Sequence, residues 1–301
     1  MTVLAPGSKA GAAAMEVAAI KGRSLWDDAA RRLMRNRAAV VSMGMLAFLL
    51  LAAILGPVLV PYPYDQINKD DVWVQPLVHG HLLGTDSLGR DLLARLLVGL
   101  RISLAIGVIA TAVSLVIGVA WGATAGYLGG QIDELMMRIV DVLYSLPFIF
   151  FVILLMVTFG RNFILMFLAI GAVEWLTMSR IVRGQTVTLK QKEFIEAARA
   201  AGLSTPAIIR RHIIPNLLGP VVVYVTLTIP AVIMAESFLS FLGMGVQEPL
   251  TSLGTLISAG AQNSDLAPWL LIFPSVVMVA ALMSFNFIGD GLRDAIDPKD
   301  R

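Results

Sequence analysis

The amino-acid sequence predicts an all-α, polytopic membrane protein. Of its 301 residues, 57% are hydrophobic and 15% are charged, whereas a soluble domain is about 45–50% apolar and about 25% charged. The apolar residues are gathered into long runs, and about 20 such residues let a helix cross a hydrocarbon core roughly 30 Å thick. Lys and Arg are distributed unevenly among the polar stretches between the runs. Together these features predict a bundle of transmembrane helices.

Six runs have the length of a membrane span, so we expect six transmembrane helices within a membrane domain at residues 38–289. Glu174 interrupts the fourth run, which is the weakest of the six. Prolines inside the runs are expected to kink the helices, and neighbouring helices can satisfy the carbonyl groups that the kinks free. These prolines are Pro147, Pro220, Pro230 and Pro274. The runs are approximately residues 38–60, 102–125, 139–160, 163–179, 213–235 (continuing toward residue 242) and 266–289.

Residues 1–37 precede the first run and end in a cluster of arginines. Within them, residues 26–36 place Trp26, Leu33 and Met34 at helical spacing, which predicts a helix lying in the membrane interface. A solvated linker is the alternative. No cleavage site of small residues follows the first apolar run, so we predict no cleaved signal peptide.

The distribution of Lys and Arg predicts the orientation. With the N-terminus in the cytoplasm, the inner segments hold 18 of these residues and the outer segments hold 5, and cytoplasmic loops are enriched in them. The N-terminus, the loop at 180–212 and the tail at 290–301 are therefore predicted to be cytoplasmic. The outer loop at 61–101 is expected to be irregular, with a helix at 88–100. It is too short for a core of its own, so it should pack on the membrane domain or on a partner.

The longest charged interruption, residues 190–215, is predicted to form two short helices. Residues 193–201 are strong helix formers, and Gly202 is placed to end that helix. Thr205 is the expected cap of the second helix, with a proline at its first position. Pro215 is expected to end the second helix and to open the next span. We expect this element to press against a partner that drives movement across the membrane.

No catalytic constellation is visible. The phosphate-binding pattern G-x-x-x-x-G-K-[ST] is absent, so we do not expect the chain to hydrolyse nucleotides by that route. His79 and His81 have acidic neighbours at Asp86 and Asp91, but metal sites are usually tighter and richer in ligands, so no metal site is predicted. The chain has no Cys and hence no disulfide.

Three carboxylates fall within or beside the predicted spans, at Asp141, Glu174 and Glu236. A charge in hydrocarbon costs about 2.5–3.5 kcal/mol on insertion scales, so such residues usually face the bundle interior or a watery cavity. For Asp141 and Glu174 we favour hydration, or pairing with Arg138 or Arg180 at the cytoplasmic interface, over a role as gate. For Glu236, a gate or subunit contact and a local hydrogen bond between helices are equally open.

Gly118, Gly122 and Gly126 are spaced by four, and Ala110 and Ser114 share their helix face. Stripes of small residues let helices approach closely in lipid. We expect this stripe to mediate packing within the chain rather than between chains.

Part of residues 190–215 resembles the EAA signature of ABC importer permeases. The matching residues are Glu196, Ala197, Ala198, Gly202 and Pro215. His212 stands where Ile is usual, and Ile214 where Leu is usual. Further stretches, between about residue 31 and the C-terminus, are similar to the C-type permease subunit of the dipeptide, oligopeptide and nickel importer family. They are HLLGTDSLGRDLLARLLVGLRISL (81–104), DELMMRIVDVLYSLP (133–147), ESFLSFLGMGVQ (236–247) and FNFIGDGLRDAIDP (285–298).

The resemblance implies a type I ABC importer permease fold and a non-catalytic, alternating-access role for peptides in the bacterial cytoplasmic (inner) membrane. In that family the EAA helix docks in a groove on an ATP-binding subunit. The implied partners are a second, homologous permease subunit forming a heterodimer, two ATP-binding subunits that hold ATP and Mg²⁺, and an extracytoplasmic solute-binding protein. No cofactor or nucleic acid is expected on this chain. The implied ATPase-coupling residues are Glu193, Glu196, Ala197, Ala198, Arg199, Gly202 and Pro215.

Two alternatives stay beside this hypothesis. Within the family, the solute is nickel or another small molecule rather than a peptide. From another class, the chain is a proton-driven secondary carrier with Asp141, Glu174 or Glu236 as proton sites. A membrane-bound enzyme is disfavoured because no paired catalytic groups lie near an interface.

Overall fold

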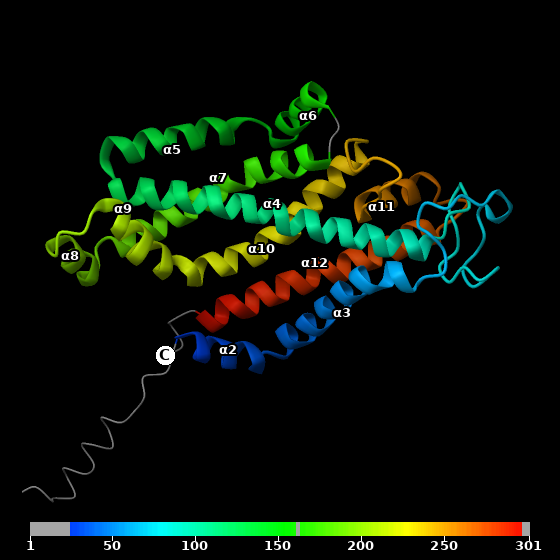
Figure 1. Ribbon diagram of the computed structural model, residues 1–301, viewed down its shortest axis with the longest axis horizontal. Helices are drawn as coiled ribbons and strands as arrows, with labels where there is room; N and C mark the ends of the chain where they lie inside the picture. Colours follow the sequence, from blue (N-terminus) through cyan, green and yellow to red (C-terminus); the bar gives the residue numbers. More distant parts are fainter. Residues whose placement is uncertain (1–24, 161–162, 297–301) are drawn as a thin grey trace, which may run out of the picture.

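The computed structural model describes residues 25–160 and 163–296, and in these residues the regular elements are all helices. The predicted all-α class is confirmed. Most helices run along the long axis of the molecule, with the loop between α3 and α4 at one end and α8 and α9 at the other (Figure 1). In chain order they are α2 (Leu25–Arg35), α3 (Arg37–Leu59), the 3₁₀ turn η1 (Lys69–Asp71), α4 (Leu92–Leu128), α5 (Gly130–Ser145), α6 (Phe148–Phe159), α7 (Phe163–Leu189), α8 (Glu193–Ala200), α9 (Thr205–Ile208), the π turn η2 (Ile209–Ile213), α10 (Ile214–Phe241), α11 (Leu253–Gln262) and α12 (Trp269–Ile296).

In the described residues, four helices are long and apolar enough to cross a membrane. They are α3, α4, α12 and the helix that runs through α9 and η2 into α10. The pair α5 and α6, bent by 84°, is a fifth if it forms one span. α7 holds the fourth predicted run and is not among these helices, so the predicted count of six stays a prediction. The protein is a multi-pass membrane protein.

α4 spans 37 residues and continues without a break. Asp91 caps its first turn, its Oδ1 accepting a hydrogen bond from the backbone N–H of Ala94 at 2.8 Å, and Gly129, with φ 70°, follows its last residue. The helix expected at 88–100 is present from Leu92, but it does not end at residue 100, because no proline or turn interrupts the 37 residues between these caps. Such a helix is about 55 Å long, which exceeds a hydrocarbon core of roughly 30 Å. It therefore projects beyond the bilayer.

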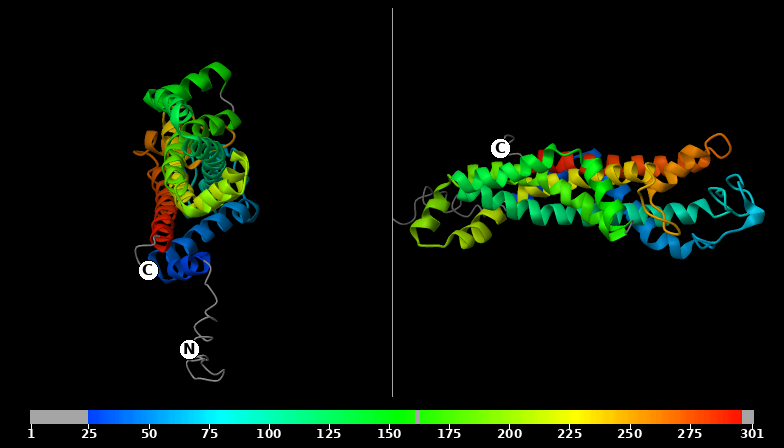
Figure 2. Two further views of the ribbon diagram at one scale, coloured as in Figure 1. Left: turned by 90° about the vertical axis from the view of Figure 1, so that its left-hand side faces the viewer. Right: turned by 90° about the horizontal axis from the view of Figure 1, so that it is seen from above.

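The glycine stripe of α4 packs against α7, which confirms the expected packing within the chain. A Cβ at Gly118 would lie 2.6 Å from Met178 Cβ, and one at Gly122 would lie 2.3 Å from the carbonyl oxygen of Ser179. Backbone approach this close needs residues without side chains. Seen end-on, α5 and α6 cover one side of this central layer, and α3 and α12 cover the other (Figure 2).

Pro147 breaks the third predicted run rather than kinking it. Leu146 has extended backbone (φ −75°, ψ 133°), and α6 starts directly after the proline. Proline disfavours the α conformation in the residue before it, which explains the break. α5 is attached to α7 by Arg183, whose Nε and Nη2 donate to the two carboxylate oxygens of Asp133 at 2.6 and 2.7 Å.

The loop between α3 and α4 is irregular, as expected, and packs on the membrane domain. Trp269 Nε1 at the start of α12 donates to the carbonyl oxygen of Thr85 at 3.3 Å. His81 Nδ1 lies 2.8 Å from Asp91 Oδ2, and His79 Nδ1 lies 2.7 Å from Asp71 Oδ1. The hydrogen bond with His79 lowers the pKa of the Asp71 carboxyl. In the described residues no cluster of three or more His, Asp or Glu is placed to hold a metal ion.

α2 confirms the helix predicted at residues 26–36. α2 ends at Arg35. The next residue, Asn36, caps α3, because its side chain accepts a hydrogen bond from the Ala39 N–H at 3.2 Å. A Cβ at Gly291 of α12 would lie 2.8 Å from Ala39 Cβ and 3.1 Å from Leu33 Cδ1, so the junction of α2 and α3 packs closely on α12.

Candidate functional site

The charged element, residues 190–215, lies at the far end of the molecule, beyond the ends of α3 and α12 (Figure 1). Its first helix, α8, has Glu193 and Glu196 in the first turn and Arg199 in the last. Acidic residues at a helix N-terminus and basic residues at its C-terminus interact favourably with the helix dipole. The order of charges along residues 193–200 thus stabilises this short helix.

Gly202 ends α8, as predicted. Its φ is +79°, and its N–H donates to the Arg199 carbonyl at 3.0 Å, while Leu203 N donates to the Ala198 carbonyl at 3.2 Å. This pair of bonds is the Schellman arrangement, which needs a left-handed residue and therefore favours glycine. The chain turns sharply at Gly202 without any side-chain contact, because an added Cβ would meet nothing within 4 Å.

One face of α8 is buried in the bundle and the other is exposed. Ile195 is fully buried and Ala198 is 7% exposed. Both join an apolar cluster with residues of α4, α7 and α10, among them Tyr127, Val182 and Leu217. α8 therefore packs on an apolar cluster to which α4, α7 and α10 also contribute.

Six of the seven implied coupling residues are exposed and available to a partner. Only Ala198 faces inward, so its contribution is to pack α8 on its own bundle. Arg199 and Lys190 both lie over the Tyr127 ring at the end of α4, with Cζ and Nζ 5.6 and 5.8 Å from its centroid. The exposed residues are Glu193, Glu196, Ala197, Arg199, Gly202 and Pro215.

The second helix of the charged element differs from the prediction in two ways. Ser204 rather than Thr205 is the N-cap residue of α9, since its backbone is extended (φ −68°, ψ 151°). Pro215 does not end this helix, which continues through the π turn η2 into α10. A π turn inserts an extra residue and rearranges the hydrogen-bond ladder, which lets the helix pass a proline that has no N–H.

Asp141 is paired with Arg180, one of the two partners expected for it. Arg180 Nη2 donates to Asp141 Oδ1 at 2.7 Å, the two side chains being 40% and 60% exposed. Since Arg180 is engaged there, the pairing of Glu174 with Arg180 or Arg138 is not found. Glu174 is half-buried on α7 and has no hydrogen bond or ion pair to any part of the chain that the structure describes.

Glu236 forms a hydrogen-bond network between helices. It is fully buried, and its Oε1 accepts from Ser240 Oγ at 2.6 Å and from Ser252 Oγ at 2.7 Å. Ser103 Oγ on α4 lies 3.5 Å from Oε2 and accepts from the Leu253 N–H at 3.0 Å. Three elements, α4, α10 and the start of α11, thus meet at one carboxyl group.

Replacing Glu236 is expected to lower the stability of the fold, and the loss should grow with the number of serine hydroxyl groups left without a hydrogen-bond acceptor. Glu236→Leu leaves buried hydroxyls unpaired, each at a cost of about 1–3 kcal/mol, whereas Glu236→Gln keeps an oxygen acceptor and can donate to Ser103. The thermal midpoint of the purified protein in detergent should fall strongly for the Leu variant and little for the Gln variant. Met234→Leu, on the exposed face of the same helix, is the control. Equal midpoints for the Leu and Gln variants of Glu236 would contradict the network.

Comparisons with known proteins identify similar chains. The family described as binding-protein-dependent transport system inner membrane component matches residues 114–301, and the N-terminal TM domain of oligopeptide transport permease C matches residues 24–76. The oligopeptide transport system permease protein OppC of Escherichia coli (strain K12) is 55% identical over 283 residues, covering 94% of each chain. The dipeptide transport system permease protein DppC of Bacillus subtilis (strain 168) is 43% identical over 279 residues, covering 92% of this chain and 87% of the relative.

A solved structure shows the same fold. The inward-facing MetNI methionine ABC transporter has a chain that matches with a TM-score of 0.56 at 21% identity, covering 67% of this chain and 96% of that chain. A second crystal form of MetNI matches with a TM-score of 0.54 at 22% identity.

Proposed function

Because the chain belongs to the family of binding-protein-dependent transport system inner membrane components, we propose that it is the permease subunit of an ATP-driven peptide importer. Its relatives are named oligopeptide and dipeptide transport permeases, which favours peptides over nickel or another small solute. The chain would form half of the translocation pathway, together with a second, homologous permease subunit.

The observation that carries this proposal is the division of α8 into a buried and an exposed face. Glu193, Glu196 and Arg199 are exposed at the end of the molecule, while Ile195 is buried in an apolar cluster that α8 shares with α4, α7 and α10. We propose that the exposed face docks in a groove of an ATP-binding subunit. A displacement of α8 would then be transmitted through this cluster toward the long helices, since a closely packed interior transmits strain.

Energy would enter through the partners. ATP and Mg²⁺ would bind to two ATP-binding subunits, and a loaded solute-binding protein would act from the outside. A ligand shifts a conformational equilibrium only by binding one state better than the other, and ATP would do so at the ATP-binding subunits. This requires the charged element, with both termini of the chain, on the cytoplasmic side of a bacterial inner membrane.

Two of the three carboxylates in the spans favour this mechanism over a proton-driven carrier. Asp141 is ion-paired with Arg180, and Glu236 accepts hydrogen bonds from serine hydroxyl groups. Neither carboxyl is free to face a water-filled path, as proton relays in membranes do. Glu174, which has no such partner in the described residues, does not distinguish the two mechanisms.

Reconstitution tests the proposal. The chain is purified with its second permease subunit, the ATP-binding subunits and the solute-binding protein, and the complex is placed in liposomes. We expect uptake of labelled di- and oligopeptides that requires ATP, requires the solute-binding protein and stops when the ATP-binding subunits are inactivated. Uptake by this chain alone, driven by a proton gradient, would overturn it.

A further inference from the structure

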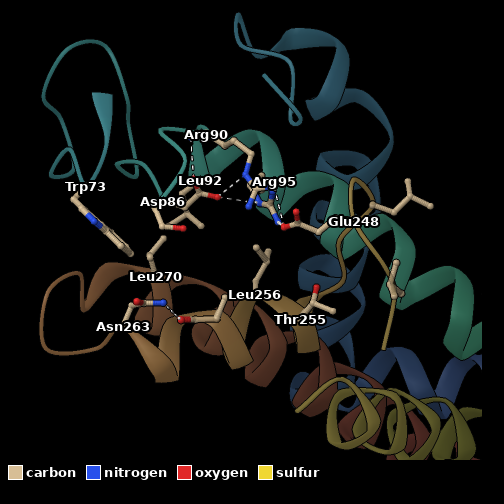
Figure 3. A pocket seen from close by; sticks show the side chains of 14 residues that line it. Trp73, Asp86, Arg90, Leu92, Arg95, Glu248, Thr255, Leu256, Asn263 and Leu270 are labelled. Atoms are coloured by element: carbon tan, nitrogen blue, oxygen red, sulfur yellow. Dashed lines mark hydrogen bonds and ion pairs between the residues drawn. The ribbon is translucent and has the colours of Figure 1, made fainter. Parts of the chain in front are cut away.

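A small cavity lies at the end of the bundle opposite the charged element. It is formed by the outer loop, the first turns of α4 and the helix α11, and its volume is about 100 Å³ (Figure 3). A cavity of about 10–15 Å³ holds one water, so this one has room for several heavy atoms. Its wall is partly apolar, from Leu92, Leu256 and Leu270, and partly charged, from Arg90, Arg95 and Glu248.

Arg95 lines this cavity, and its guanidinium group makes fewer hydrogen bonds than it can donate. Its side chain is 7% exposed, and its Nε and Nη1 have no hydrogen-bond partner in the part of the chain that the structure describes. The nearest carboxylate oxygens are Asp86 Oδ2, 3.7 Å from Nε, and Glu248 Oε1, 3.8 Å from Nη2. Both distances exceed those of hydrogen bonds. A buried charged donor without a hydrogen bond is costly. An anion that accepts hydrogen bonds from the Arg95 guanidinium would therefore bind favourably here.

The two neighbouring carboxylates differ in how firmly they are held. Asp86 accepts from Leu88 N at 2.9 Å, from Arg90 N at 3.0 Å and from Arg90 Nε at 2.7 Å, and it is largely buried. Glu248 is 63% exposed, and its ion pairs are with Arg90 Nη1 at 2.9 Å and, more weakly, with Arg95 Nη2 at 3.8 Å. Asp86 is thus fixed, and Glu248 is free to swing out.

When Glu248 leaves, Nη2 of Arg95 loses the carboxylate oxygen that lies 3.8 Å away, and Nη1 has no hydrogen-bond partner in the described residues. The remaining charges at the site are Arg90, Arg95 and Asp86, which sum to a net positive charge. A planar guanidinium presents paired donors that match the two oxygens of a carboxylate. The small volume restricts the ligand to a carboxylate with a short aliphatic stem.

We propose that this cavity is a carboxylate-binding site, in which Arg95 binds the ligand and Glu248 occupies the site in its absence. The ligand is a free monocarboxylate of the size of propionate or the C-terminal carboxylate of a peptide. Binding here does not depend on the proposed transport function, and it is measured without transport.

Ligand-induced stabilisation of the purified full-length chain in detergent tests the site. The probe is sodium propionate, with sodium chloride and propionamide at matched concentrations as controls. A saturable rise in the thermal midpoint with propionate, absent with both controls, is expected. An equal rise with chloride or propionamide would overturn the proposal. The peptide Gly-Gly is compared with Gly-Gly amide: stabilisation by the former alone identifies a peptide C-terminus as a ligand, and stabilisation by propionate alone identifies a free monocarboxylate.

Two variants with opposite expected effects sharpen the test. Arg95→Gln should raise the half-saturating propionate concentration by about tenfold or more, as loss of a charged hydrogen-bond partner predicts. Glu248→Gln should lower it by about two- to fivefold, the worth of an exposed ion pair. If Arg95→Gln does not fold, Glu248→Gln decides alone, since an unchanged or weakened affinity in that variant would refute the competition between Glu248 and the ligand.

Discussion

Gly122→Val is expected to prevent the bundle from assembling. The new Cβ would lie 2.3 Å from the carbonyl oxygen of Ser179 and 2.9 Å from the backbone nitrogen of Arg183. Both are backbone atoms of α7, so no change of rotamer relieves the contact, and α4 and α7 must separate. Overpacking a tight interface costs about 1–3 kcal/mol even where side chains can adjust, and here the cost should exceed that range.

The matched control is Gly44→Val on α3, where an added Cβ meets nothing within 4 Å. Both variants place the same β-branched residue in an apolar helix, so intrinsic helix propensity cancels between them. The measurement is the yield of monodisperse protein from membranes, together with its thermal midpoint in detergent. We expect low yield and a strongly lowered midpoint for Gly122→Val alone. Equal values for the two variants would show that the α4–α7 contact does not limit assembly.

Local signals in the sequence predicted much of this fold. The positions of the apolar runs, the glycine stripe and the end of α8 at Gly202 each depend on residues a few positions apart, where helical spacing and backbone preference decide the outcome. The same locality explains the confirmed pairing of Asp141 only in part. The sequence offers Arg138 and Arg180 as partners. Arg180 is the one that pairs with Asp141, because α5 and α7 lie side by side in the folded chain.

Long-range contacts were not predictable in this way. Nothing in the sequence near Glu236 indicated Ser103, which is 133 residues away and reaches it across a helix interface. Arg95 is similar, since the lack of hydrogen bonds at its Nε and Nη1 depends on the distances of Asp86 and Glu248 in the folded chain. The π turn before Pro215 was missed because proline normally breaks a helix. The extra residue of a π turn changes the backbone hydrogen bonds, and no residue type in Ile209–Ile213 signals it in the sequence.

The boundary of the outer loop illustrates a third case. The sequence places Arg101 at the end of the outer loop, outside the hydrocarbon where charges rarely sit, yet it lies in the third turn of a continuous helix. Arg101 can lie both outside the hydrocarbon and within α4, because α4 is longer than the hydrocarbon core is thick. Charge patterns report depth in the bilayer, whereas helix continuity is set by caps and by the absence of breakers.

Gly202→Val is expected to abolish coupled transport while leaving the bundle intact. A β-branched residue is strained at φ +79°, and since an added Cβ would meet nothing within 4 Å, the whole effect comes from the backbone. The turn after α8 should open and move the exposed face of that helix away from its proposed partner. Gly202→Asn should retain most activity, because Asn tolerates the left-handed region. Gly184→Val on α7, with an added Cβ in open space and ordinary helical backbone, is the control.

Two measurements separate the proposed coupling from a loss of folding. The first is co-purification of the ATP-binding subunits, and the second is ATP-dependent peptide uptake in liposomes. Both should fall much further for Gly202→Val than for Gly202→Asn, with unchanged amounts of this chain in the membrane. Glu196→Lys should have a similar effect without strain, since it reverses a charge on the exposed face of α8. If the Val and Lys variants keep both readouts at the level of Gly184→Val, α8 is not the contact through which ATP drives this permease.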